Sequence, residues 1–310
     1  MDDVVSAMLQ TLNDGFPAVG EMTAAEARAA VAARRQPGSN LDDVEATSDE
    51  LIDGPGGPLP IRIYRPHRNG GAAVVFCHGG GFVLCDIESH DGFCRELAKE
   101  CSAVVVSVGY RLAPEHRAPA AAEDAFAAFQ WVVAHAAGLG VDEGRVAIAG
   151  DSAGGNLAAV AAIMCRARDA PMPVAQVLLY PVIDPTFDTE SYRSRATGYF
   201  NTRAAMQWYW HQYLGGDDPP RPPWMVAPAR AESHTRLPQA LVVTAELDPL
   251  HSEGIGYADL LRTAGVPVVH LDFPGLFHGF LTMMPFAPAV AARALLWAEL
   301  RALLAVELVR

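Results

Sequence analysis

A serine between glycines is the first feature of the chain that could do chemistry. Ser152 is the centre of the sequence Gly150-Asp151-Ser152-Ala153-Gly154. An apolar run over residues 145–149 precedes it, and small residues over 155–162 follow it. This order predicts a strand, a tight turn and a helix, with the serine in a strained backbone conformation above the sheet. Larger residues two positions to either side would clash, so both are glycine, but the pattern alone is modest evidence for a nucleophile.

A serine nucleophile also needs backbone donors for the charge that develops on the attacked carbonyl oxygen. The sequence His78-Gly79-Gly80-Gly81 follows an apolar run over residues 73–77. Consecutive glycines let the backbone approach a ligand closely and turn its N–H groups inward. We therefore predict an oxyanion hole made by the N–H groups of Gly79, Gly80 and Ala153. His78 is expected to organise this loop rather than to act as a base.

The base that activates the serine is predicted to be His278. In this type of site the chain order is serine, acid, histidine, so histidines before Ser152 are set aside. His278 lies in residues 274–280, a predicted loop at the carboxyl end of the last predicted strand, where a base must stand. Four other histidines follow the serine: His211 and His234 in an insertion, His251 near the candidate acid, and His270 inside a strand, where an ordinary core residue is expected.

The acid that orients the histidine is predicted to be Asp248. It follows an apolar run over residues 241–244 and precedes Pro249, which places it on a loop at the same edge of the sheet. Its task is to fix the histidine tautomer and to stabilise the imidazolium. The other acids considered after the serine are Asp184, Asp188, Glu246 and Asp272.

The elements that must position these residues alternate between apolar runs and helical patterns. Residues 44–52 and 60–64 flank a turn rich in glycine and proline, which predicts an antiparallel pair. The later runs are continuously apolar, as in strands covered on both faces. We predict an α/β fold with a mostly parallel, doubly wound sheet and right-handed crossovers. Further strands are expected at 73–77, 103–108, 145–149, 174–180, 241–244 and 266–271, and helices at 4–12, 24–35, 90–100, 118–136, 155–162 and 288–308.

The alternation lapses between residues 184 and 238. This segment is rich in tyrosine and tryptophan and contains a proline-rich loop over 218–223. We predict that it covers the carboxyl edge of the sheet, where ligands bind in open α/β folds. The alternative is an extra helix that packs its aromatic side chains into the core.

Composition excludes several kinds of partner. The 310 residues are half apolar and can bury a large core. A net charge of −13 argues against nucleic acid as a partner. The five cysteines match no metal site or disulfide framework, so we expect them reduced and the protein cytoplasmic. The sequence shows no signal peptide and no apolar run near the ~20 residues of a membrane span, so no membrane partner is expected.

Five motifs together resemble the bacterial hormone-sensitive-lipase-like (family IV) carboxylesterases of the α/β-hydrolase superfamily. They are His78-Gly79-Gly80-Gly81-Phe82, Tyr110-Arg111-Leu112-Ala113-Pro114-Glu115-His116, Gly150-Asp151-Ser152-Ala153-Gly154-Gly155-Asn156, Asp248-Pro249-Leu250 and His278-Gly279-Phe280. The resemblance implies one domain over 1–310 with an eight-stranded sheet. It implies a cap built from about 1–40 and 184–236, over a catalytic core of about 41–183 and 237–310.

The same resemblance implies ester hydrolysis through an acyl-enzyme, without a cofactor. Asp151 would hold neighbouring loops by hydrogen bonds, although a structural acid on the surface is the alternative. Two departures leave every catalytic group in place: Arg117-Ala118-Pro119 stands where Pro-Phe-Pro is frequent, and His251-Ser252-Glu253-Gly254 where Arg-Asp-Glu-Gly is frequent. The second puts the titratable His251 near Asp248.

The expected substrate is a small ester with a short or medium acyl chain, because an aromatic cap limits the pocket. The same triad could serve an amide, lactone or carbamate, since it suits all acyl transfers. A non-catalytic small-molecule receptor is a further alternative, although receptors on this scaffold lack the base. The closing helix is apolar on several sides, which together with the resemblance predicts a homodimer through this helix and the last strand.

Overall fold

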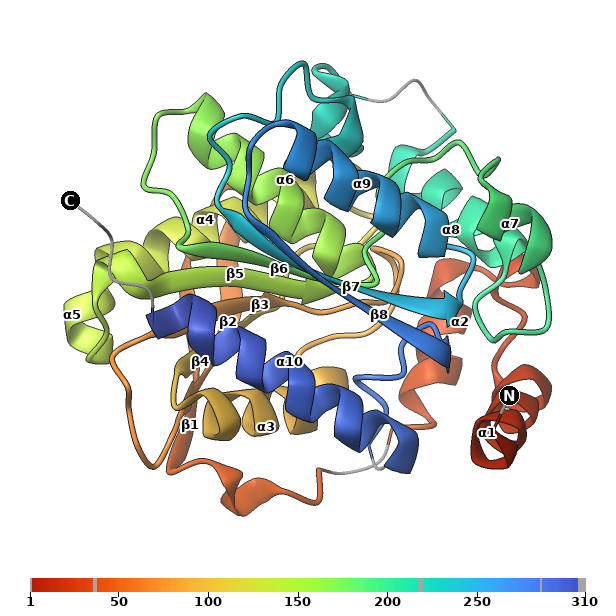
Figure 1. Ribbon diagram of the computed structural model, residues 1–310, viewed down its shortest axis with the longest axis horizontal. Helices are drawn as coiled ribbons and strands as arrows, with labels where there is room; N and C mark the ends of the chain where they lie inside the picture. Colours follow the sequence, from red (N-terminus) through yellow and green to blue (C-terminus); the bar gives the residue numbers. More distant parts are fainter. Residues whose placement is uncertain (1, 36–37, 217–219, 285, 306–310) are drawn as a thin grey trace.

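The computed structural model describes residues 2–35, 38–216, 220–284 and 286–305, and centres on an eight-stranded sheet (Figure 1). The strand order is β1-β2-β4-β3-β5-β6-β7-β8. The β1–β2 and β2–β4 pairs are antiparallel, and all later pairs are parallel. The predicted α/β fold with a mostly parallel sheet is therefore confirmed. The strands are β1 (Ala46–Gly54), β2 (Gly57–Arg65), β3 (Ala73–Cys77), β4 (Val104–Val108), β5 (Val146–Asp151), β6 (Ala175–Leu179), β7 (Gln239–Leu247) and β8 (Val268–Phe277).

Helices cover both faces of the sheet (Figure 1). α3 and α10 pack on one face, and α4, α6 and α9 pack on the other. Strands β3 to β6 are buried along their whole length, which explains why their sequences are apolar without alternation. The helices are α1 (Asp3–Gly15), α2 (Ala24–Ala32), α3 (Asp91–Cys101), α4 (Ala120–Ala134), α5 (Ala136–Leu139), α6 (Ala153–Ala167), α7 (Glu190–Ser194), α8 (Arg203–Leu214), α9 (His251–Thr263) and α10 (Ala287–Ala305).

Strand β8 is longer than predicted. It was expected to end at residue 271, but pairing with β7 continues to Phe277 beyond a register shift between Ala245 and Leu247. The N–H of Gly275 donates to Glu246 Oε2 at 2.7 Å and helps to hold this extension. Residues 274–277 therefore form a strand rather than the predicted loop, and His278 follows the strand directly.

Other differences concern the ends of elements. Helix α2 starts at a capping box between Thr23 and Glu26, and it ends at Ala32 rather than near residue 35. Parts of three predicted segments lie outside the described residues: Pro37 after the second helix, 218–219 in the proline-rich loop, and 306–308 at the end of the closing helix.

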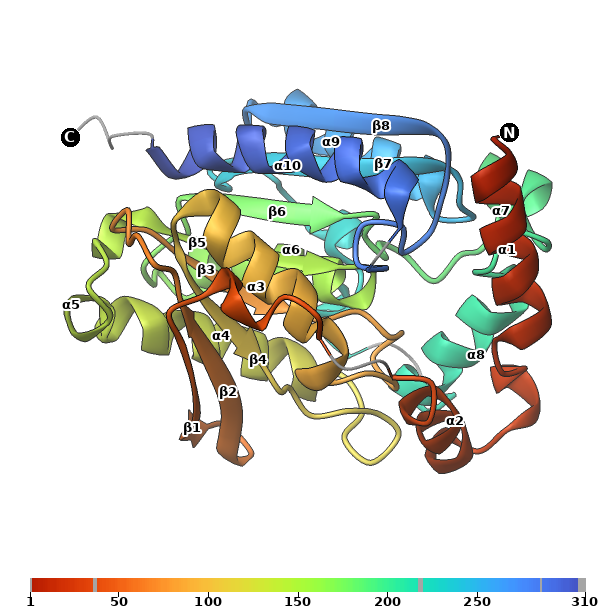
Figure 2. The ribbon, with the colours of Figure 1, turned by 90° about the horizontal axis from the view of Figure 1, so that it is seen from below.

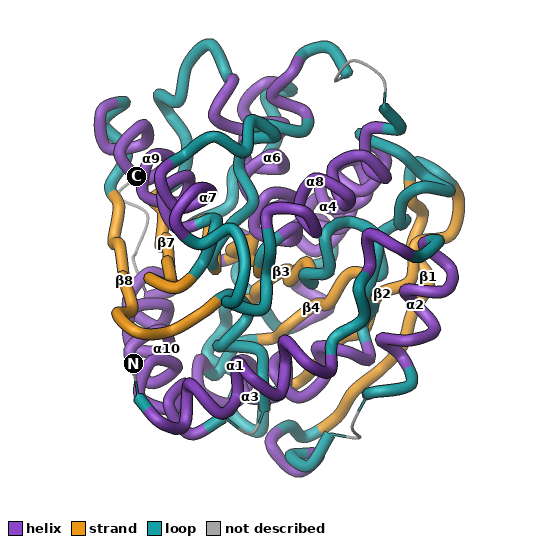
Figure 3. Tube along the Cα trace, turned by 90° about the vertical axis from the view of Figure 1, so that its right-hand side faces the viewer, coloured by secondary structure: helices purple, strands orange, loops and turns teal. Residues whose placement is uncertain are grey.

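The carboxyl end of the sheet is covered by segments from two distant parts of the sequence. Figure 2 shows α1, α2, α7 and α8 grouped at this end, and Figure 3 looks onto it. The side chain of Asn13 in α1 bonds to the backbone of Gly198 and Phe200. From α8, the ring of Tyr213 stacks on Phe82 at a centroid distance of 3.9 Å. These contacts join the N-terminal helices, residues 184–236 and the edge of the sheet into one wall.

Candidate active site

Ser152 lies on the turn between β5 and α6, with φ 55° and ψ −116°. This region is costly for a residue with a side chain, and it is found where surrounding structure imposes it. A Cβ atom on Gly154 would overlap the carbonyl oxygen of Cys77, and one on Gly150 would overlap the backbone of Gly154. The two glycines therefore permit the turn that the sequence predicted, and the turn lifts the hydroxyl above the sheet.

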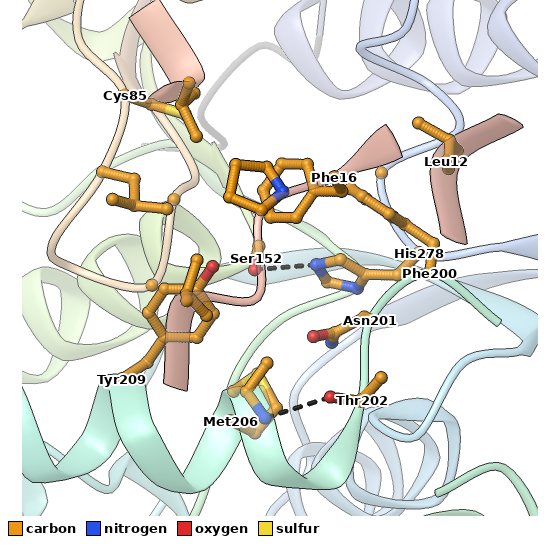
Figure 4. A pocket seen from close by; sticks show the side chains of 18 of the residues that line it. Leu12, Phe16, Cys85, Ser152, Phe200, Asn201, Thr202, Met206, Tyr209 and His278 are labelled. Carbon is orange, nitrogen blue, oxygen red and sulfur yellow. Dashed lines mark hydrogen bonds between the residues drawn. The ribbon is translucent and has the colours of Figure 1, made fainter. Parts of the chain in front are cut away.

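A chain of two hydrogen bonds links the predicted serine, histidine and aspartate. The Oγ of Ser152 lies 2.9 Å from His278 Nε2, and His278 Nδ1 lies 2.7 Å from Asp248 Oδ2. Figure 4 shows the first of these bonds at the wall of a cavity. The residues stand at the carboxyl ends of β5, β8 and β7, and all three are buried. Segments separated by more than a hundred residues thus meet at one edge of the sheet.

The surroundings of Asp248 determine which ring nitrogen of His278 carries a proton. Its side chain is fully buried, and its Oδ1 accepts the N–H of Leu250 at 2.9 Å. The carboxylate facing His278 Nδ1 can only accept, so Nδ1 carries the proton and Nε2 is left to accept from the serine. Three of the other four candidate acids have other partners: Asp184 pairs with Arg230, Asp272 with His251, and Glu246 with the Gly275 N–H.

The glycine loop differs from the prediction in one donor. The N–H of Gly79 donates to Asp151 Oδ1 at 2.7 Å, so it is already occupied and does not face the cavity. Gly80 and Gly81 line the cavity beside Ser152, and neither N–H donates to another described residue. Both have positive φ, and a Cβ on Gly81 would overlap the ring of Tyr209. The N–H of Gly79, which the sequence analysis assigned to the oxyanion hole, is thus bonded to Asp151 in the structure.

Asp151 is a buried carboxylate rather than a surface acid. Its Oδ1 also lies 3.1 Å from His90 Nε2, and 4 % of the residue is exposed. Burial alone would raise the pKa of Asp151, but the charge and hydrogen bond of His90 lower it below its usual value. The carboxylate joins the serine turn to the glycine loop, as predicted. Sequence reasoning missed His90, because it precedes the serine and carries no catalytic pattern around it.

His78 holds the glycine loop through hydrogen bonds. Its Nδ1 donates to the carbonyl oxygen of Gly79 at 2.7 Å, and the Tyr110 ring stacks on it at 4.3 Å. The Tyr110 hydroxyl donates to the carbonyl oxygen of His78 at 2.7 Å. Burial, together with the neighbouring His90, lowers the pKa of His78 to about 4, so the ring is neutral at neutral pH. This agrees with the predicted role.

His251 and Glu253, which follow Asp248 in the sequence, also differ from expectation. His251 was predicted to be a titratable group near the acid, but its Nε2 faces Asp272 Oδ1 at 2.9 Å. Glu253 was not singled out, yet it is buried and its Oε1 accepts the N–H of Ile183 at 2.8 Å. Burial raises the pKa of Glu253 well above its usual value. It ties α9 to the segment after β6.

A cavity of about 650 Å³ opens above the serine. Its walls come from the N-terminal helices, the glycine loop, the start of α8 and the turn after β8. The lining is mainly apolar, and no lysine or arginine lines it in the described part of the chain. Among the described residues, no cluster of histidine, cysteine, aspartate and glutamate is arranged to hold a metal ion. None of the described helices has the length and apolar content to cross a membrane. The lining of the cavity includes Leu12, Phe16, Cys85, Phe200, Met206 and Tyr209.

Known proteins match this chain over most of its length. Carboxylic ester hydrolase LipN of Mycobacterium tuberculosis is 39% identical over 302 residues, covering 94% of this chain and 80% of that protein. Ethyl acetate hydrolase of Pseudomonas putida is 36% identical and covers 90% and 91%. A thermostable esterase of Pseudomonas putida ECU1011 has a TM-score of 0.91 at 35% identity, covering 99% and 98%. Residues 74–282 match the family described as alpha/beta hydrolase fold. The chain therefore belongs to the alpha/beta hydrolase fold family, in its hormone-sensitive-lipase-like group.

Proposed function

We propose that the protein is a serine carboxylesterase with Ser152 as nucleophile, His278 as base and Asp248 as orienting acid. The two relatives reported above are named as ester hydrolases, one of them after ethyl acetate, and they align with nine-tenths or more of this chain. The observation that carries the proposal is the hydrogen-bonded chain from Asp248 through His278 to Ser152, open to a cavity.

The proposed reaction has two halves. His278 Nε2 takes the proton of Ser152 while Oγ bonds to the ester carbonyl carbon and the carbonyl π electrons move onto oxygen. The tetrahedral intermediate re-forms the carbonyl and breaks the bond to the alcohol oxygen, which receives the proton from His278. Water then attacks the acyl-enzyme with the same base, and the acid leaves as Ser152 regains its proton.

The oxyanion hole is proposed to consist of the N–H groups of Gly80, Gly81 and Ala153. Ala153 is the first residue of α6, where N–H groups have no partner within the helix and the helix dipole favours negative charge. The free N–H groups of Gly80 and Gly81 beside the serine support the assignment. The Gly79 N–H instead fixes the loop through Asp151.

We propose short or medium acyl chains as substrates. A cavity of about 650 Å³ lies within the range of small-molecule pockets, and aromatic side chains limit it. A series of p-nitrophenyl esters should peak at short or medium length. A maximum beyond about ten acyl carbons would contradict a cavity of this size.

We also propose that α1, α2 and residues 184–236 form a cap over the rest of the chain, with boundaries of about 1–40 and 184–236. The bonds from Asn13 to Gly198 and Phe200 support this division. The five cysteines are free, which supports a reducing compartment such as the cytoplasm.

A homodimer through α10 and β8 is a separate proposal. Val290 and Leu295 on α10 are more than half exposed, and β8 is an edge strand that pairs on one side only among the described residues. Light scattering should show a dimer at micromolar concentration. A monomer alone under these conditions would contradict it.

The experiment that tests the function compares Ser152→Ala with Ser233→Ala, a change at an exposed serine. Both variants should keep the circular dichroism spectrum of the wild type. Turnover of p-nitrophenyl butyrate should fall by at least about 10⁴-fold in Ser152→Ala only. Wild-type activity in Ser152→Ala would refute the proposal.

A further inference from the structure

Asn201 is a buried polar residue in the cavity wall. Only 8 % of the residue is exposed, and its Nδ2 has no hydrogen-bond partner among the described residues. Figure 4 shows its side chain at the cavity, next to His278 and below Ser152. Leaving a buried amide unpaired costs free energy, so such a group in a ligand cavity points to a bound partner.

Other residues hold the loop that carries Asn201. The Asn13 side chain donates to the carbonyl oxygen of Gly198 at 2.9 Å and accepts the N–H of Phe200 at 2.9 Å. Phe200 has a φ of 68°, and the ring of Phe16 packs edge-on against it at 5.0 Å. These contacts from α1 fix the loop in a backbone conformation that is costly for phenylalanine. The Asn201 amide is therefore not needed to shape the loop.

The loop that carries Asn201 lies beside the turn that carries His278. The Phe200 ring lies 3.9 Å from the position a Cβ on Gly279 would take, so the loop abuts the turn that carries His278. His278 delivers its proton to the alcohol oxygen, so the wall beside it faces the alcohol portion of the ester. Thr202 and Thr282 also line this region, but their hydroxyls bond to the Ala205 N–H and to the Gly279 carbonyl oxygen.

We propose that Asn201 is a specificity-determining residue that hydrogen-bonds a polar atom in the alcohol portion of the substrate. This inference rests on the proposed esterase function. The χ2 torsion of asparagine is soft, so the amide can turn either its N–H₂ group or its oxygen to a ligand. The titratable side chains of the lining are Glu21, Cys85, His90, Asp151, Tyr209 and His278, none of them permanently cationic, so the polar atom is expected to be neutral rather than anionic. Esters of alkoxy- or hydroxy-substituted alcohols have this chemistry.

Two esters of equal length test this inference. Butyl acetate and 2-methoxyethyl acetate differ by the exchange of one CH₂ group for an ether oxygen. Their kcat/KM values are measured by pH-stat for the wild type, Asn201→Leu and Gln207→Leu. The Gln207 amide is exposed on the neighbouring helix α8 and does not line the cavity, which makes it a matched control.

The preference for the ether over the alkyl ester should fall about five- to tenfold in Asn201→Leu and stay unchanged in Gln207→Leu. Leucine has a similar size and removes an unpaired polar group, so the variant should melt at or above the wild-type temperature. Asn201→Ala provides the same comparison if leucine does not fit. An equal preference in the wild type and the Asn201 variants would overturn this inference alone. No hydrolysis of either ester by the wild type would overturn the proposed function, and this inference with it.

Discussion

Replacing Asp248 by asparagine should reverse the proton positions on which the proposed mechanism depends. Asp248 Oδ1 accepts the N–H of Leu250, and Oδ2 faces Nδ1 of His278. In Asp248→Asn the amide oxygen must take the place of Oδ1, since two N–H groups cannot bond to each other. The amide N–H₂ then faces Nδ1, which must accept, and the ring proton moves to Nε2. A protonated Nε2 cannot take the proton of Ser152.

The expected loss is about 10⁴-fold in kcat, equivalent to about 5.5 kcal/mol of transition-state stabilisation. The loss should appear in kcat more than in KM, because the side chain at position 248 is fully buried and does not line the cavity. The assay is steady-state hydrolysis of p-nitrophenyl butyrate near neutral pH. Thermal unfolding of the same samples checks that the variant is folded.

Asp184→Asn is the matched control, because Asp184 was a candidate acid but pairs with Arg230 in the structure. It should retain activity within a few-fold of the wild type. A folded Asp248→Asn variant with nearly full kcat would refute the assigned role of the acid. A loss in Asp184→Asn as large as in Asp248→Asn would refute the choice between the two carboxylates.

Further predictions concern the glycine loop, His78 and the contact between α1 and residues 198–200. Gly81→Ala should reduce kcat/KM about 10²- to 10³-fold, because a Cβ there overlaps the Tyr209 ring and displaces a proposed oxyanion donor. Gly256→Ala, where a Cβ meets no atom within 4 Å, is the control and should stay active. Equal activities of the two variants would contradict the donor assignment. The pKa of His78 is lowered to about 4, below its unfolded value of about 6.5, so the unfolded state binds more protons in this window and stability is lost as pH falls through it. Urea unfolding should show a loss of about 2 kcal/mol between about pH 7 and pH 5 in the wild type beyond that in His78→Asn, and equal losses would count against a neutral buried ring. Asn13→Ala should raise KM several-fold with a smaller effect on kcat, because it releases the loop at Gly198 and Phe200 from α1; unchanged kinetics would show that this clamp does not shape the cavity.

The sheet, and the positions of the proposed catalytic residues at its edge, were predictable because each leaves a local mark in the sequence. Continuous apolar runs identify strands covered on both faces: β3 matches its predicted range, and β5 begins one residue and ends two residues later than predicted. Ser152 follows such a run, His278 follows the predicted strand over 266–271 after a short segment, and the carboxyl ends of parallel strands share one edge. The chain order of the triad then leaves few candidates.

Features set by long-range contacts could not be read in this way. The spacing of the glycines does not say which N–H faces the cavity, and Gly79 is turned away only because Asp151 is buried beside it. The extension of β8 depends on Glu246, which lies in the neighbouring strand. The partner of His251 is likewise Asp272, from β8 rather than from its own helix. Asn201 carried no signal in the sequence, because the burial of its side chain and the lack of a partner for Nδ2 among the described residues arise only after the chain has folded.

Trapping the acyl-enzyme tests the proposed role of Ser152 most directly. The protein is mixed with a slowly hydrolysed acylating ester, quenched in acid, digested and analysed by mass spectrometry, with Ser152→Ala treated in parallel. The wild type should gain one acyl group, located on Ser152 in the peptide that contains Gly150-Asp151-Ser152-Ala153-Gly154, and the variant should gain none. Ester turnover by the wild type with the acyl group on another residue, or undiminished turnover by Ser152→Ala, would contradict it.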